Sequence, residues 1–179
     1  MSAKWRYIGG GVMSKKITLY SLLTLFAIVI SYLEGLIFQF IPIPGFKLGL
    51  ANCISMLLLS RKKYCAAIAI NVMRITLSAL LFGNLYSLLF SLSGATLSTI
   101  VALIFIKFKC FSFAGVSTAA GTAHNLGQII AAIVFLSTPG LVYLTPILII
   151  CGAVTGLAAG ILLNIFSKKY KKIIDIIGE

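Results

Sequence analysis

The stretch RKKYCAAIAINVMRITLSALLF, residues 61–82, decides which kind of protein this is. Three cations precede an apolar run from Tyr64 to Phe82, and the only charged residue in that run is Arg74. An α-helix rises about 1.5 Å per residue, so about 20 apolar residues cross the roughly 30 Å hydrocarbon core of a bilayer. The stretch is therefore typical of a transmembrane helix with a cationic anchor at its start.

The composition extends this interpretation to the whole chain. Of 179 residues, 60% are hydrophobic and only 10% are charged, with a mean hydropathy of +1.12. Soluble domains have about 25% charged residues. The long apolar runs lack the period of two that a membrane β-barrel would show. The sequence therefore predicts an all-α integral membrane protein in contact with the lipid bilayer.

Six apolar segments indicate a six-transmembrane-helix bundle of one domain, residues 13–167. Five are long enough to cross, and the second is short. They are residues 17–41, 48–59, 64–82, 85–106, 114–136 and 141–166. Residues 1–12, with the only tryptophan, are predicted to be an added leader outside the natural protein. Residues 168–179 form a basic tail that either lies against anionic lipid or docks a cytoplasmic partner.

The distribution of cations predicts the orientation of the bundle. In a six-helix protein the two termini and the even-numbered connections share one side, and nearly all cations of the chain lie there. The positive-inside rule then places both termini in the cytoplasm. Because topology accounts for most of the +12 formal charge, nucleic-acid binding is not indicated. The cations are Lys4, Arg6, Lys15, Lys16, Arg61, Lys62, Lys63, Lys107, Lys109, Lys168, Lys169, Lys171 and Lys172, with Lys47 on the opposite side.

Small residues four apart mark close helix contacts, because apolar association is weak in lipid. Most such stripes are expected to pack within the chain, and an exposed one would mark a partner surface. The stripes are Ala27, Ser31 and Gly35; Ser87, Ser91 and Ala95; Ser117 and Gly121; and Gly152, Gly156 and Gly160.

Several polar residues interrupt the apolar segments. An ionisable group at a helix centre costs at least about 2.5–3.5 kcal/mol, so such groups are either paired or functional. Arg74 and His124 each lie about 15 Å from the cytoplasmic end of their segments if these are helical. We expect a solute pocket in the outer half of the membrane; the alternative is a Glu34–Arg74 pair that only holds the bundle together. The predicted ligand-binding residues are Glu34, Lys47, Asn52, Arg74, Asn84, His124, Asn125 and Gln128.

The charges also predict the ligand. Lys47 and Arg74 outnumber Glu34, which favours an anionic ligand, and Phe46, Phe82 and Tyr86 could cover a flat ring. Enzyme activity is not expected. The chain has no GxxxxGK[ST] loop for ATP, no clustered carboxylates for a metal and a single histidine. Its four cysteines lack CxxC spacing, so no metal or cofactor is predicted.

Four segments of the chain resemble a known family. The resemblance is to the bacterial Gx transporter family, labelled heptaprenyl diphosphate synthase component I and similar to the S components of energy-coupling factor (ECF) transporters. The segments are LEGLIFQFIPIPGFKLGLAN, NVMRI, FGNLYSLLFSLSGATLS and GTAHNLGQI.

The resemblance implies a multi-pass protein of the bacterial cell membrane with a ligand site near the outer face. It also implies uptake energised by a separate ECF coupling subunit and ATPases, which Ala27 and Ser31 of the first helix would contact. Two alternatives stay open. One is a non-catalytic membrane subunit in prenyl-quinone synthesis or in flavin- and quinone-linked extracellular electron transfer, with a membrane partner. The other is a purely structural scaffold.

Overall fold

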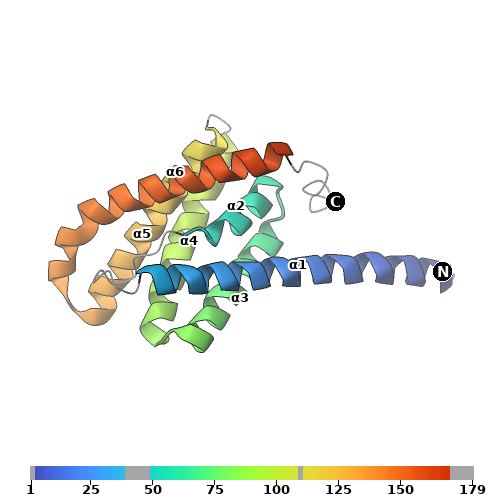
Figure 1. Ribbon diagram of the computed structural model, residues 1–179, viewed down its shortest axis with the longest axis horizontal. Coiled ribbons are helices and arrows are strands. Elements are labelled where there is room, and N and C mark those ends of the chain that lie inside the picture. Colours follow the sequence, from blue (N-terminus) through green and yellow to red (C-terminus); the bar gives the residue numbers. More distant parts are fainter. Residues whose placement is uncertain (1–2, 39–48, 109–110, 170–179) are drawn as a thin grey trace.

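The computed structural model describes residues 3–38, 49–108 and 111–169, and all regular structure within them is helical (Figure 1). This confirms the predicted all-α class. The six α-helices and one 3₁₀-helix are α1 (Ala3–Phe38), α2 (Asn52–Ser60), α3 (Tyr64–Phe82), α4 (Leu85–Phe108), α5 (Phe113–Leu136), η1 (Pro139–Leu144) and α6 (Thr145–Lys169).

Five of these helical segments are long and apolar enough to cross a membrane. The exception is α2, whose 9 residues extend only about 14 Å. The sixth crossing stays a prediction, because residues 39–48, which precede α2, lie outside the described residues. The last predicted segment is also divided: η1 comes first, and α6 begins at Thr145 with Pro146 in its first turn, where a missing N–H is tolerated.

Local signals place the helix ends close to their predicted positions. The Ser112 side chain accepts a hydrogen bond from Gly115 N at 3.2 Å and caps α5. Lys62 and Ser137 have left-handed backbones, with φ of 59° and 51°, and follow the ends of α2 and α5. Helix α1 begins at Ala3, so it includes most of the residues predicted to be a leader.

Glycines allow α5 to lie directly against its two neighbours. A Cβ built on Gly121 would lie 2.5 Å from Gly152 O, and one on Gly127 would lie 2.9 Å from the Cα of Gly94. The backbones of α5 and α6, and of α4 and α5, therefore touch. This confirms that the glycine stripe of residues 152, 156 and 160 packs within the chain. These two pairs make the most extensive helix contacts, and α5 is the central helix.

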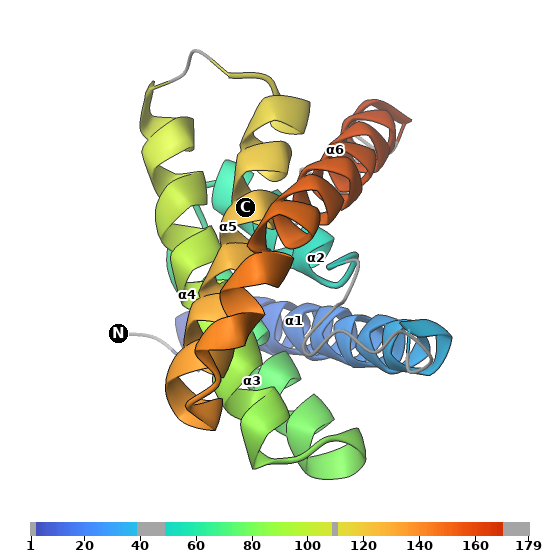
Figure 2. The same ribbon diagram turned by 90° about the vertical axis from the view of Figure 1, so that its left-hand side faces the viewer.

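The helices converge around α2. A buried apolar cluster there includes Leu58, Leu59, Ile70 and Val116, so α2 packs into the bundle although it is short. The N-terminal end of α1, the C-terminal end of α6 and the α2–α3 connection all lie toward the right of Figure 1. Figure 2 shows the α3–α4 turn at the opposite end of the bundle from the end of α4 and the start of α5.

The cationic connection before α3 allows the predicted topology to be tested. In a cysteine-free background, Lys63→Cys should react with a membrane-impermeant thiol reagent only after the cells are opened. Gly140→Cys, exposed near the other end of α5, should react in intact cells. Labelling of Lys63→Cys in intact cells would contradict the cytoplasmic placement of this connection.

Candidate functional site

The buried guanidinium of Arg74 is the centre of a hydrogen-bond network between three helices. The Arg74 side chain, on α3, is only 8% exposed. Its Nη1 donates to Ser31 Oγ of α1 at 2.9 Å, and its Nη2 donates to Asn52 Oδ1 of α2 at 2.9 Å. Nη2 also donates to Asn71 Oδ1, one turn earlier in α3, at 2.6 Å. The network therefore fixes α1 and the start of α2 against α3.

Glu34 supplies the opposite charge beside this network. It is 3% exposed, and its Oε1 accepts a hydrogen bond from Leu50 N at 2.5 Å. The carboxylate also acts electrostatically on Arg74. Each buried charge lowers the cost of burying the other, and removing one would leave the other uncompensated. Glu34 thus holds the turn that leads into α2 and balances Arg74.

The polar residues of α5 form a second cluster. His124, Asn125 and Gln128 are all buried. Asn125 Nδ2 donates to Leu148 O of α6 at 3.0 Å, so this side chain joins α5 to α6. Gln128 packs against α4, since a Cβ on Gly94 would lie 2.7 Å from Gln128 Cγ. Two of the three predicted ligand-binding residues on α5 therefore make contacts that hold the helices together.

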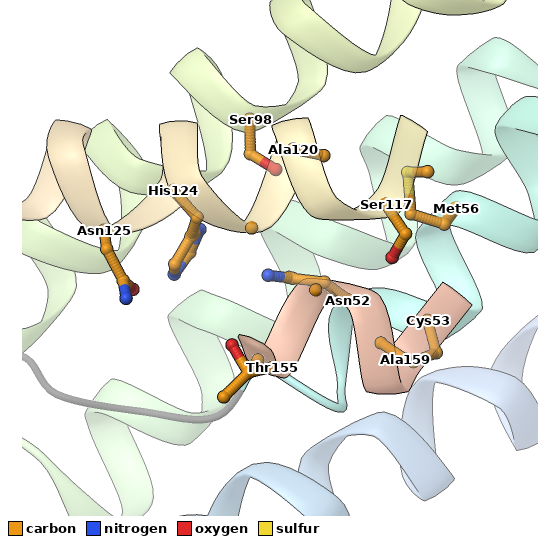
Figure 3. A pocket seen from close by; sticks show the side chains of 13 residues that line it. Asn52, Cys53, Met56, Ser98, Ser117, Ala120, His124, Asn125, Thr155 and Ala159 are labelled. Atoms are coloured by element: carbon orange, nitrogen blue, oxygen red, sulfur yellow. The ribbon is translucent and has the colours of Figure 1, made fainter. Parts of the chain in front are cut away.

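Asn52 connects the two clusters. Its Oδ1 accepts from Arg74, while its amide nitrogen points toward His124 across a small cavity lined by α2, α4, α5 and α6 (Figure 3). The cavity measures about 20 Å³. A water molecule needs about 10–15 Å³ measured in this way, so one water fits and a metabolite does not. In this conformation His124 and Asn125 face a space for water only.

A larger cavity, here named the Arg74 cavity, lies between α1, α3 and α4. Its volume is about 310 Å³, at the lower end of the usual range for ligand sites. Among the described residues, Arg74 Nε and Ser78 Oγ have no hydrogen-bond partner. The rings of Tyr32 and Phe82 lie on its wall, with centroids 4.4 Å apart. The cavity is lined by Ser31, Tyr32, Gly35, Leu36, Arg74, Ile75, Ser78, Ala79, Phe82, Gly83, Ser87 and Ser91.

The serines of this cavity were not among the predicted ligand-binding residues. Ser87 and Ser91 were assigned to a packing stripe, but they line the Arg74 cavity. A spacing of four residues shows that two side chains share a helix face, and it does not show whether a helix or a cavity lies opposite. No pattern in the sequence indicated that Ser78 of α3 lines a cavity.

The remaining predicted residues lie elsewhere. Asn84 is exposed and caps α4, because its Oδ1 accepts from Ser87 N at 2.8 Å. Lys47 lies outside the described residues. Ala27 and Ser31, the predicted contacts of a coupling subunit, are buried within the chain, at 0% and 7% exposed. They face inward because Ser31 bonds Arg74 and Ala27 leaves room for close packing.

The sequence matches one family model. The model of heptaprenyl diphosphate synthase component I matches residues 23–166, which include α2 to α5, both polar clusters and the Arg74 cavity. No curated protein and no solved structure matches the sequence. The match covers most of the chain, and the chain therefore belongs to the heptaprenyl diphosphate synthase component I family.

Proposed function

We propose that this protein is a membrane-embedded solute-binding subunit that holds its ligand in the Arg74 cavity, in the outer half of the membrane. The proposal rests on the Arg74 side chain, which is buried and lines a cavity of about 310 Å³. A cation inside a membrane protein is costly, and such residues mark solute pathways unless they are purely structural.

The lining also favours a class of ligand. A guanidinium prefers carboxylate or phosphate oxygens, and the serine hydroxyls can donate to the same group. The Tyr32 and Phe82 rings and the aliphatic wall favour an apolar or flat aromatic remainder. The proposed ligand is a small anionic or strongly polar metabolite with an apolar part. Asn52 acts through Arg74, whose guanidinium it orients.

Transport would need other subunits. The sequence lacks the GxxxxGK[ST] loop that cradles ATP phosphates, so the energy for uptake is proposed to come from a separate coupling subunit and ATPases. That subunit would contact an exposed helix face, because Ala27 and Ser31 are turned inward. Membrane vesicles that contain this chain alone are expected to show binding without accumulation of the solute.

Removal of the guanidinium tests this proposal. In Arg74→Gln, ligand affinity should fall about 10- to 150-fold, the equivalent of about 1.5–3 kcal/mol for a lost hydrogen bond to a charged group. Native mass spectrometry of the detergent-purified protein should show a co-purified small molecule on the wild type and little on Arg74→Gln. The matched control is Lys107→Gln, which removes an exposed cation of α4. Equal occupancy in all three proteins would contradict the assignment of the cavity.

The family description favours a second candidate. It names one component of a synthase, which fits a non-catalytic membrane subunit in prenyl-quinone synthesis or in flavin- and quinone-linked electron transfer. A stable complex with a prenyl synthase or a flavin-carrying protein, isolated from native membranes by affinity capture, would favour this candidate. Capture of a coupling subunit with ATPases would favour uptake.

A further inference from the structure

The mouth of the Arg74 cavity lies on the outer surface of the bundle. Tyr32 and Leu36 of α1 and Phe82 of α3 line the cavity, yet they are 39%, 42% and 55% exposed. All three belong to segments that are long and apolar enough to cross the membrane. Between them, a Cβ built on Gly35 would meet no atom of the described residues within 4 Å, so these residues leave the wall open at this position.

The ends of the helices that form the mouth indicate its depth in the membrane. Phe82 is the last residue of α3, and Gly83, in the turn to α4, also lines the cavity. The mouth therefore extends to the end of the membrane-crossing segments, where hydrocarbon gives way to lipid head groups. Tyrosine side chains are enriched at this level, and Tyr32 stands at the mouth.

The lining changes from the mouth inward. Near the mouth it is aromatic and aliphatic, through Tyr32, Leu36 and Phe82. One to two helical turns before Phe82 in α3, Ser78 and Arg74 make it polar and cationic, and Ser31 lies directly before Tyr32 in α1. A molecule that matches both ends has an anionic group for Arg74 and an apolar part for the mouth and the surrounding lipid.

We propose that the Arg74 cavity takes an amphiphile, an anionic phosphate or carboxylate head group on an apolar chain, which enters sideways from the lipid leaflet. This rests on the proposed solute-binding function and narrows its substrate class. The head group contacts Arg74 and the serine hydroxyls, and the chain leaves the cavity past Gly35 and Leu36, beside the packed rings of Tyr32 and Phe82. A water-soluble anion with the same head group would lose the contacts at the mouth.

The test compares two probes with the same head group. The protein is placed in phosphatidylcholine nanodiscs, and bound hexadecyl phosphate or methyl phosphate is counted by native mass spectrometry after release. The wild type should bind hexadecyl phosphate at least about tenfold more tightly than methyl phosphate. Gly35→Leu adds a side chain where a Cβ would meet no atom of the described residues within 4 Å, and it should weaken hexadecyl phosphate binding about tenfold or more. Arg74→Gln should do the same, and Lys107→Gln should bind as the wild type does.

Each other outcome would contradict the amphiphilic ligand, the sideways entry or the binding site itself. If both phosphates bind equally and Arg74→Gln weakens both, the amphiphile is wrong and the solute-binding site stands. If Gly35→Leu binds hexadecyl phosphate as the wild type does, the sideways entry is wrong. If Arg74→Gln retains full binding of both probes, or neither probe binds the wild type, both proposals fail. Should Arg74→Gln not fold, Gly35→Leu alone still decides the route of entry.

Discussion

Glu34→Ala should lower the free energy of unfolding by about 3–5 kcal/mol, the usual cost of leaving a buried charge without its compensating charge. The substitution leaves the buried charge of Arg74 without its carboxylate and the Leu50 N–H without its acceptor. The measurement is thermal or denaturant unfolding in a mild detergent, with the midpoint followed by circular dichroism. The expected result is a large decrease in the midpoint of unfolding of the whole protein.

The control for this prediction is a double-variant cycle. Arg74→Met should also destabilise the protein. It removes the positive charge beside Glu34 and the donor to the oxygen atoms of Ser31, Asn52 and Asn71. Glu34→Ala combined with Arg74→Met should be clearly more stable than the sum of the single losses predicts, since no buried charge is left. Additive losses would mean that the two charges do not stabilise each other.

Gly156→Ala should lower the free energy of unfolding by about 3 kcal/mol, at the top of the usual range for overpacking. A methyl group on Gly156 would overlap the carbonyl oxygen of Ser117 and lie 2.9 Å from the Cα of Thr118. Both obstacles are backbone atoms of α5, so α5 and α6 would have to separate along their whole contact. The midpoint of thermal unfolding in detergent would report the loss.

A matched glycine on the same helix pair gives the control. A methyl group on Gly115 of α5 would make an ordinary contact, 3.5 Å from Phe111 Cδ1. Since alanine favours helix over glycine by about 0.5–1 kcal/mol, Gly115→Ala should be neutral or stabilising. If the two variants lose the same stability, the close α5–α6 crossing does not set the stability of the bundle.

The sequence predicted the parts of the fold that depend on local pattern. The apolar run after the cations gave α3 its observed bounds, Tyr64–Phe82, and the glycines of residues 152–160 indicated the contact that α6 makes. The length and hydropathy of a helix depend only on its own residues, so a single sequence is enough to predict its bounds. Length and hydropathy did not settle the number of crossings, because α2 is a buried helix too short to span.

The candidate site was predictable in its residue types and less so in its geometry. Arg74 and Glu34 were recognisable because a charge at membrane depth needs a partner or a ligand. Asn84 directly precedes α4, and an asparagine there signals a helix cap, which explains its position outside the cluster. The bond from Asn125 to Leu148 and the cavity beside Ser78 depend on how the helices pack, which no spacing rule specifies.

The order in which the residues of the Arg74 network are synthesised has a consequence for membrane insertion. Apart from Asn71 in the same helix, the groups that bond or balance Arg74 precede α3: Ser31, Glu34 and Asn52. During synthesis they leave the ribosome first, so α1 and α2 can already be at the membrane when α3 arrives. An arginine at a helix centre costs about 2.5–3.5 kcal/mol on insertion, and waiting partners lower that cost. We therefore expect the first third of the chain to assist the membrane insertion of the helix that follows it.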